Sequence, residues 1–478
     1  METMIYPENQ FQNRRLLISV AAYIVLSFLL TILLRLPVSL SIILAAQIVL
    51  FFLVSSRPVW AIAALLAGQL TASNYVFYAN STQISIRFVW TIFAVLLLIS
   101  ILVKEKRINL GHRAKRVIIP SIIFFVFAIV ANIASSDTTN TMEYVRLVTT
   151  WLVILILLPA VIKNAKDMKI LAIVAIITCS ISAVFALAQH FHFTIPPFST
   201  TIVGTRFVGR RAIGLNDNPV DLSFTLPIII IPALSLLFHG AVNRTYKVRV
   251  ILSILLMCAA IYFTFTRSGM YALGAGAIAL LLFIRTKIKK EIFLAVLMVC
   301  VAFVTYTNIV GNRYSQGFSN EDSAAARLVL WQASLKIVHD YPVLGIGNRG
   351  FKNISPNYIS TIQYDPTVVS AGDILGVEEP HNDFLRVWVS FGTPALIAFL
   401  WIFISIIRNF LESYRKSSTR LIKGIALGGF AALVTYIVSA ATHNVMDSVC
   451  FLWILGGISI ATCKLAETKG PKPVKALA

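Results

Sequence analysis

Arginines stand directly beside apolar segments at several places from residue 206 onward. Arg206, Arg210 and Arg211 precede an apolar run that begins near residue 219, and Arg267 lies between two apolar runs in Thr266-Arg-Ser-Gly. A guanidinium group donates paired hydrogen bonds to phosphate oxygens and stays charged at any relevant pH. The pattern therefore indicates a site that binds phosphate groups.

Arg267 has a second interpretation. An arginine at the mouth of two apolar helices is costly to desolvate unless it has a partner. It can snorkel to the membrane interface or pair with a carboxylate such as Asp217 or Asp447. The same cationic character recurs at three separate sites. This recurrence favours a common phosphate-binding site over snorkelling or a local ion pair.

His381 is the candidate general base. It lies in Glu378-Glu-Pro-His-Asn-Asp, where Glu378, Glu379 and Asp383 are near neighbours in the sequence. A neighbouring carboxylate can orient an imidazole and make it a better base near neutral pH, and an unperturbed histidine titrates near ~6.5. The alternative interpretation is that His381 caps the helix that follows it.

Several further polar residues are candidates for supporting roles. His443 and Asp447 are four residues apart and are expected to form a hydrogen-bonded pair, which we interpret as structural rather than catalytic. Arg386, Arg206 and the three carboxylates around His381 complete this supporting set.

Motifs for metal-dependent or nucleotide-dependent chemistry are missing from the sequence. It contains no Walker motif, no H-E-x-x-H, no G-x-S-x-G and no Asp-x-Asp of the type that holds a metal in nucleotide-sugar enzymes. The five cysteines lie inside or at the edges of apolar runs without close pairing, so neither a disulfide framework nor a zinc site is indicated. We therefore expect no cofactor and no metal.

The elements that must position these residues are membrane-spanning helices. Hydrophobic residues make up 58% of the chain and charged residues only 13%, against about 25% charged in soluble domains. The apolar runs are about 16–20 residues long, enough to cross roughly 30 Å of hydrocarbon as helix. Only helices satisfy their own backbone hydrogen bonds in lipid, so we expect an all-α polytopic protein with about 12–14 transmembrane helices.

Our placement has these spans near residues 16–34, 38–54, 59–75, 86–103, 117–134, 147–162, 170–188, 219–238, 250–266, 268–284, 292–308, 384–407, 425–441 and 449–463. The first span follows Arg14-Arg15 and has no small-x-small site after it, so we interpret it as a retained span and not a cleaved signal.

The distribution of charge predicts the orientation. With both termini in the cytoplasm, the cytoplasmic segments hold 28 of the 41 Lys+Arg and 7 of the 20 Asp+Glu, so the whole net charge of +21 lies inside. The basic stretch at 104–116 is then a topology anchor and not a nucleic-acid site. In this orientation Arg211, Arg267, His381 and His443 all lie on the external face.

The domain organisation is a single membrane domain, with spans from about 16 to 463 and a cytoplasmic tail at 464–478. A large external loop at 308–382 separates the eleventh and twelfth spans, and loops of that length are usually functional. It contains an expected amphipathic helix at Ser323–His339, with Leu328, Trp331, Leu335 and Val338 at helical spacing. Turn residues at 341–350 end this helix.

On these residues the sequence resembles the bacterial O-antigen ligase and O-antigen polymerase superfamily of membrane glycosyltransferases. Two motifs match in spacing, at Arg211-Ala-Ile-Gly-Leu215 and from His381 to Gly392. The arginine turn at 266–269 and the stretch from Arg327 to Phe351 also resemble this superfamily. The resemblance covers roughly residues 145–463.

The resemblance implies a metal-independent, inverting transfer outside the bacterial cytoplasmic (inner) membrane. The donor is a glycan on undecaprenyl diphosphate, and the acceptor is a sugar hydroxyl on lipid A–core or on another lipid-linked repeat unit. By the same resemblance, Arg211 and Arg267, with Arg210, bind the diphosphate, and His381 takes the proton of the acceptor hydroxyl. The external loop covers the site, and a groove between helices holds the prenyl chain.

Three functions remain open from the sequence. Both motifs favour a ligase in lipopolysaccharide or surface polysaccharide assembly, but a polymerase of the same superfamily differs only in its acceptor. A flippase for the same lipid-linked glycan also needs cationic residues near a phosphate. A flippase should carry charge deep within several spans, whereas the arginines here concentrate at one face.

Overall fold

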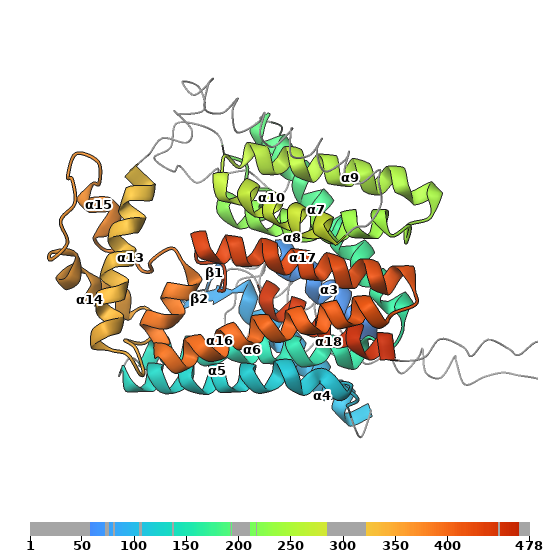
Figure 1. The fold of residues 1–478 in the computed structure, drawn as a ribbon, viewed down its shortest axis with the longest axis horizontal. Coiled ribbons are helices and arrows are strands. Elements are labelled where there is room, and N and C mark those ends of the chain that lie inside the picture. The colour runs from blue at the N-terminus through green and yellow to red at the C-terminus, as the bar shows by residue number, and fades with distance from the viewer. Residues whose placement is uncertain are drawn as a thin grey trace, which may run out of the picture.

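The computed structural model describes residues 58–71, 76–79, 82–104, 108–135, 138–191, 193, 211–216, 218–283, 322–447 and 450–467. In these residues the chain forms a bundle of long helices lying alongside one another, with a smaller helical unit across one end (Figure 1). The expected all-helical membrane fold is confirmed, apart from one short β-hairpin.

The first half of the bundle contains five helices, one 3-10 turn and one short β-hairpin among the described residues. The helices and strands are α3 (Pro58–Thr71), β1 (Val76–Ala79), β2 (Thr82–Ser85), α4 (Ile86–Lys104), the 3-10 turn η1 (His112–Ala114), α5 (Lys115–Ala134), α6 (Thr138–Val161) and α7 (Ala165–His190). The antiparallel hairpin pairs Val76 with Ser85 and Ala79 with Thr82.

The second half supplies the elements that carry the candidate site residues. Its helices are α8 (Pro219–Phe238), α9 (Arg244–Phe263), α10 (Arg267–Leu282), α13 (Asp322–Asp340), α14 (Gly350–Ile359), α15 (Ala371–Ile374), α16 (Asp383–Lys416), α17 (Arg420–Thr442) and α18 (Phe451–Glu467). Within the bundle, α17 packs on α8, α10 and α16, while α16 also packs on α5 and α18.

Seven of the described helices are long and apolar enough to cross a membrane, so the chain is a multi-pass membrane protein. They are α5, α6, α7, α8, α9, α16 and α17. The predicted spans at 16–34, 38–54 and 292–308 lie outside the described residues, and every other predicted span overlaps a helix. Continuous apolar runs predict helices well in lipid, because the backbone has no other way to satisfy its hydrogen bonds there.

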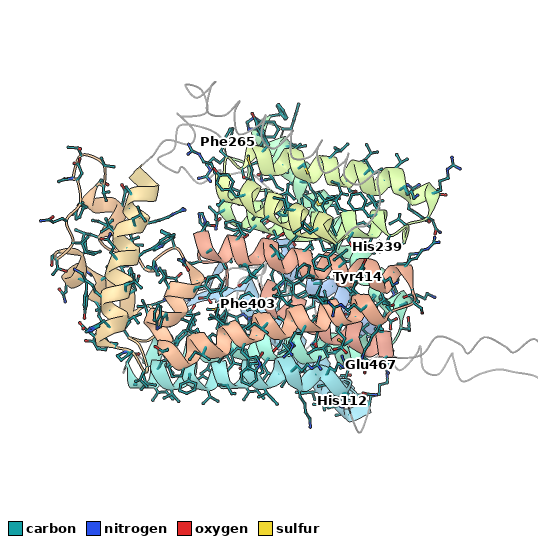
Figure 2. All side chains as sticks on the ribbon, viewed as in Figure 1. His112, His239, Phe265, Phe403, Tyr414 and Glu467 are labelled. Carbon is teal, nitrogen blue, oxygen red and sulfur yellow. The ribbon has the colours of Figure 1, made fainter. Side chains whose placement is uncertain are left out.

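The two ends of the bundle differ in character. His112, His239, Tyr414 and Glu467 lie at one end, and Phe265 lies toward the other, on the side of α13 (Figure 2). We call the end that carries α13 the site end and the other the opposite end. Helices α5, α7, α9 and α17 run toward the site end, whereas α6, α8, α10, α16 and α18 start there (Figure 1).

Ion pairs tie the helices together at the opposite end. Glu412 of α16 accepts from Arg113 and, at 2.7 Å each, from Arg116 and Lys416. Arg113 also pairs with Glu467 of α18 at 2.8 Å. Isolated surface pairs contribute little, but a network with shared partners holds the ends of three segments together.

Helix α16 is broken at Gly392. Its 34 residues would extend roughly 50 Å as one helix, and the backbone at Gly392 is non-helical, with φ 81° and ψ 178°. The carbonyls freed by the break accept from the segment after α13: Ile346 N–H donates to Val389 O at 3.0 Å and Gly347 N–H to Ser390 O at 2.9 Å. This pairing satisfies the interrupted backbone within the protein.

The described residues 322–382 fold as a unit with a small apolar core of its own, to which α16 contributes Val389. The predicted helix at Ser323–His339 is confirmed as α13, but its predicted apolar face is wrong in part: Val338 is buried, whereas Leu328 and Leu335 are 57% and 51% exposed. The buried face is made by Ala326, Val329, Leu330, Ala333, Ile337 and Val338. The two alanines allow close packing there, which a pattern of large side chains does not capture.

Candidate functional site

His381 lies in the connection that leads into α16 and adopts a left-handed backbone with φ 55°. Such a conformation is uncommon for a residue other than glycine and occurs often at functional sites. The connection is fixed on both sides. Trp331 Nε1–H of α13 donates to the Pro380 carbonyl at 3.0 Å, and the Asn382 side chain accepts from two backbone N–H groups of the first turn of α16. Asn382 is thus the helix cap, and the capping interpretation of His381 is wrong.

An arginine and two histidines from three elements meet beside this connection. Arg327 Nη2 of α13 lies 3.2 Å from Nε2 of His443, which ends α17. The ring centroids of His443 and His381 are 6.3 Å apart. The edge of the Phe224 ring, from the first turns of α8, packs on His443 at 5.1 Å.

The electrostatic surroundings keep both imidazoles neutral. Burial lowers the pKa of His381 to about 4, and the charge of Arg327 adds to the lowering. Burial also holds the pKa of His443 well below its ordinary value, with contributions from Arg327, His381 and Arg211. A neutral imidazole can accept a proton, so His381 is available as a base at neutral pH.

Arg211 is attached to the turn that joins α9 and α10. Its Nε–H donates to the Thr264 carbonyl at 2.9 Å and its Nη2 donates to Thr266 Oγ1 at 2.8 Å. Burial lowers the pKa of the Arg211 guanidinium, which nevertheless stays protonated at neutral pH. The charge of Arg211 contributes to the lowering of the His443 pKa, so we include Arg211 in the candidate site.

A buried glutamine fixes the backbone that follows Arg211. Gln189 Oε1, near the end of α7, accepts from the N–H groups of Ile213 and Gly214 at 3.0 and 2.8 Å, and Gln189 Nε2 donates to the Gly214 carbonyl at 2.8 Å. The predicted Arg211–Leu215 motif is therefore a turn anchored to α7 beside the α9–α10 connection.

Arg267 is the first residue of α10 and is exposed. It follows the turn to which Arg211 is bonded, so the two predicted phosphate-binding arginines share one connection. Arg206 and Arg210, and the carboxylate of Asp217, lie outside the described residues.

Four of the predicted supporting residues, Glu379, Asp383, Arg386 and Asp447, form a charge cluster around Arg386, which is itself 2% exposed. Arg386 Nη2 donates to Glu379 Oε1 and Asn348 Oδ1, each at 3.0 Å, and also to the Asp447 carboxylate. Asp383, fully buried, has one oxygen 4.0 Å from Arg386 Nη1. One guanidinium thus faces three carboxylates.

The cluster corrects two expectations. Asp447 pairs with Arg386 and His443 with Arg327, so the predicted His443–Asp447 pair does not form. The carboxylates expected to orient His381 are engaged elsewhere: Glu379 with Arg386, and Glu378 with Lys352 at 3.6 Å. The physical reason is that a buried guanidinium attracts the nearest carboxylates more strongly than a neutral imidazole does.

Glu379 has a perturbed pKa. Burial raises the pKa of Glu379 to about 7, and the charges of Asp447 and Glu378 add to the rise against the lowering effect of Arg386. Near neutral pH this carboxyl is therefore partly protonated, which lessens the repulsion among the three acids.

Arg327 is the site residue that the sequence interpretation did not select. It appeared only as part of a family-like stretch, because a single arginine on an amphipathic helix is normally a solvated side chain. Its one distinguishing signal is its position beside the buried face made by Ala326 and Leu330. Asn348 and Asn132 were also missed; Asn132 Oδ1 of α5 accepts from Asn348 N–H at 2.9 Å, which connects α5 to the Arg386 cluster.

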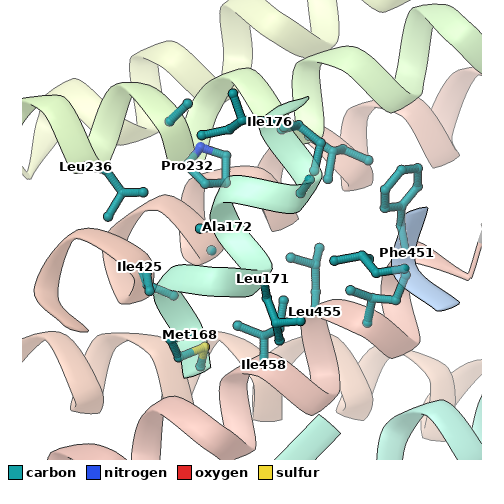
Figure 3. A pocket seen from close by; sticks show the side chains of 17 residues that line it. Met168, Leu171, Ala172, Ile176, Pro232, Leu236, Ile425, Phe451, Leu455 and Ile458 are labelled. Carbon is teal, nitrogen blue, oxygen red and sulfur yellow. The ribbon is translucent and has the colours of Figure 1, made fainter. Parts of the chain in front are cut away.

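An apolar cavity of about 90 Å³ lies inside the bundle among α3, α7, α8, α17 and α18 (Figure 3). Every residue that lines it is apolar, including Leu171, Pro232 and Ile425. Ile228 and Phe451 also line a second, smaller cavity, which contacts Phe224. The two cavities are therefore neighbours, and the smaller one adjoins Phe224, which packs on His443.

The fold and site together define a multi-pass membrane protein with a cationic and histidine-rich site at one end of its helical bundle. Residues 252–400 match the family model described as O-antigen ligase. This stretch includes Arg267, Arg327, His381 and Arg386, and it confirms the resemblance to the O-antigen ligase and polymerase type of membrane protein. A search of curated proteins found no match to this chain.

Proposed function

We propose that this protein transfers a glycan from undecaprenyl diphosphate to an acceptor sugar hydroxyl on the external face of the bacterial cytoplasmic membrane. The observation that carries the proposal is the meeting of Arg211, Arg327, His381 and His443 at one end of the bundle. The site combines phosphate-binding charge with a neutral base, and the match of residues 252–400 to the O-antigen ligase family model supports this proposal.

In this proposal the arginines bind the diphosphate. Arg211 is oriented by two hydrogen bonds to the α9–α10 turn, and Arg267 begins the helix after the same turn. As the bond from the anomeric carbon to the phosphate oxygen breaks, the electron pair leaves with the diphosphate. Fixed guanidinium groups stabilise that developing charge without reorganising.

His381 acts as the general base. The acceptor oxygen forms its bond to the anomeric carbon from the side opposite the leaving diphosphate, which inverts the configuration, and its proton passes to the imidazole. The unusual backbone of His381 is held by Trp331 and by the cap of α16, which supports a positioned rather than incidental side chain.

The prenyl chain of the donor binds, in this proposal, at the apolar cavities near the site. The apolar cavity among α7, α8 and α17 shares the lining residues Ile228 and Phe451 with the small cavity beside Phe224. A hydrocarbon chain bound there gains the usual transfer free energy of apolar burial, while its diphosphate meets the cationic site.

The acceptor is the open part of the proposal, with lipid A–core favoured over a second lipid-linked repeat unit. The test is reconstitution of the purified protein with an undecaprenyl-diphosphate-linked glycan and each acceptor in turn. Transfer to lipid A–core marks a ligase, and growth of the lipid-linked chain marks a polymerase. Movement of the donor across vesicles without transfer would mark a flippase and overturn the proposal.

The first prediction concerns Arg211. Arg211→Lys keeps the charge but loses the paired donors that engage Thr264 and Thr266, so it should lose most transfer activity while inserting normally. Arg244→Lys, at the opposite end of the bundle, is the matched control and should stay active. A divalent-metal chelator should leave wild-type transfer intact, since in this proposal the arginines stabilise the charge of the diphosphate. Near-normal transfer by Arg211→Lys would assign this arginine to packing.

A further inference from the structure

The contact between Arg327 and His443 determines which imidazole nitrogen carries the proton. A guanidinium can only donate hydrogen bonds. For Arg327 Nη2 to donate to His443 Nε2 at 3.2 Å, Nε2 must therefore be unprotonated. A neutral imidazole then carries its proton on Nδ1, so Nδ1 of His443 is a hydrogen-bond donor.

That donor has no partner among the residues that the structure describes. His443 Nδ1 is buried from solvent, and no described atom accepts from it. A buried donor without an acceptor typically costs about 1–3 kcal/mol, and most such groups in native proteins have a partner. An unpaired donor inside a ligand-binding site therefore indicates that the ligand supplies the acceptor.

The surroundings indicate the chemistry of that acceptor. The charges of Arg327 and Arg211 act on His443, and the ring centroids of His381 and Phe224 lie 6.3 and 5.1 Å from that of His443. Two guanidinium groups favour an anionic ligand, and the donor requires an oxygen lone pair. A phosphate oxygen meets both requirements.

We propose that neutral His443 donates a hydrogen bond from Nδ1–H to an oxygen of the diphosphate of the lipid-linked donor, and that Arg327 is the positioning residue that fixes this tautomer. The proposal rests on the proposed function in taking a lipid-linked diphosphate as the ligand. It separates the roles of the two histidines: His381 accepts the acceptor's proton, and His443 stabilises the leaving group.

The division of roles follows from their neighbours. The Arg327 contact occupies Nε2 of His443, which leaves that residue no free lone pair with which to act as a base. A neutral donor aimed at the leaving diphosphate stabilises charge that increases in the transition state, so it should affect the chemical step more than binding.

Two amide substitutions separate this role from a structural one. In His443→Asn the amide nitrogen takes roughly the place of Nδ1 and keeps the donor, but the partner of Arg327 is lost. In His443→Gln the amide oxygen takes roughly the place of Nε2 and keeps the partner of Arg327, but the Nδ1 donor is lost. Transfer is measured as kcat and KM per inserted molecule with the same lipid-linked donor.

The proposal expects His443→Asn to retain transfer within about tenfold and His443→Gln to lose about 10²–10³-fold in kcat with little change in KM, the usual effect of removing one such donor. If His443 only anchors Arg327, the order is reversed, and His443→Gln is the active variant. That reversed order overturns the inference while the proposed function stands.

A second measurement does not depend on turnover. In protein labelled with ¹⁵N-histidine, His443 should show protonated Nδ1 and bare Nε2, and adding undecaprenyl diphosphate should shift the Nδ1 resonance. Arg327→Met should abolish the tautomer preference. A protonated Nε2 in the wild type, or an Nδ1 resonance unmoved by saturating undecaprenyl diphosphate, overturns the inference. Failure of wild-type protein to transfer glycan to either acceptor would instead overturn the proposed function.

Discussion

His381 and Arg386 are five residues apart in the chain and lie in opposite electrostatic surroundings. Arg386 is surrounded by carboxylates and stays charged, whereas His381 faces Arg327 and stays neutral. One segment therefore holds a permanent cation that organises the site and an uncharged base that can act on a substrate.

The lowered pKa of His381 predicts an unusual pH profile. Protonation removes the base, so kcat/KM should fall as the pH falls through the free-enzyme pKa of about 4, not through the ordinary value of ~6.5. The bound diphosphate offsets the charge of Arg327, so the acid limb of kcat should lie at higher pH than that of kcat/KM. An acid limb of kcat/KM near 6.5 would contradict this assignment.

Variants of His381 give the matching control. His381→Gln can hydrogen-bond the acceptor but cannot take its proton, so it should lose about 10²–10⁴-fold in turnover and show no acid limb. If His381→Gln keeps its turnover per inserted molecule, His381 is not the general base. The candidate base is then Glu379, the nearby carboxyl with a pKa of about 7.

The Arg386 cluster makes a prediction about folding. Arg386→Gln leaves Glu379, Asp383 and Asp447 without their common cation in a buried place, and breaking a buried ion pair in this way costs about 3–5 kcal/mol. We expect lower protein levels and a markedly lower Tm. The control is Arg408→Gln on the exposed side of the same helix, which should leave Tm within a few degrees. Equal Tm values for the two variants would mean that the cluster is not structural.

At the scale of elements, the broken helix α16 carries the site. The break at Gly392 separates a short segment that begins beside His381 from the long apolar segment that crosses the membrane. The connection after α13 pairs with the break through Ile346 and Gly347, so α13 and the start of α16 form one rigid unit. Arg327 and His381 keep their relative positions for this reason.

The break itself can be tested. Gly392→Ala would place a methyl group against the Val343 carbonyl oxygen, at φ 81°, where a side chain is strained in any case. Strain of this kind costs about 1–3 kcal/mol, and the required shift of Val343 should loosen α13. We expect reduced transfer together with faster protease cleavage within 322–382.

The control for this substitution is Gly274→Ala in α10, where an added methyl group meets nothing within 4 Å. It should leave transfer and cleavage unchanged, because alanine is a better helix former than glycine. If Gly392→Ala behaves like Gly274→Ala, the pairing between the α13 connection and α16 does not hold the site together.

At the scale of the whole molecule, the two ends of the bundle correspond to the two sides predicted from charge. The site end gathers Arg211, Arg267, His381 and His443, and the opposite end gathers the Glu412 network with its surrounding basic residues. The positive-inside rule predicts that the opposite end is cytoplasmic and the site end external.

Cysteine labelling tests this orientation. In a chain with its native cysteines replaced, Ser360→Cys in the α13–α15 unit and Ser418→Cys between α16 and α17 are both exposed positions. An impermeant thiol reagent applied to intact cells should label Ser360→Cys alone, and disruption of the cells should expose both. Labelling of Ser418→Cys in intact cells would reverse the orientation and remove the site from the external face.

The sequence by itself determined the elements of this protein, and the tertiary structure decided which side chains meet. Apolar runs predicted the helices because lipid leaves the backbone no alternative, and residue type marked Arg211 and His381 as able to bind phosphate and accept a proton. The pairings of these side chains could not be predicted in this way. Asp447 pairs with Arg386, and His443 pairs with Arg327, which lies 116 residues away from it in the chain. Such pairings depend on which charges are buried together, and burial is a property of the packed bundle and not of any one segment.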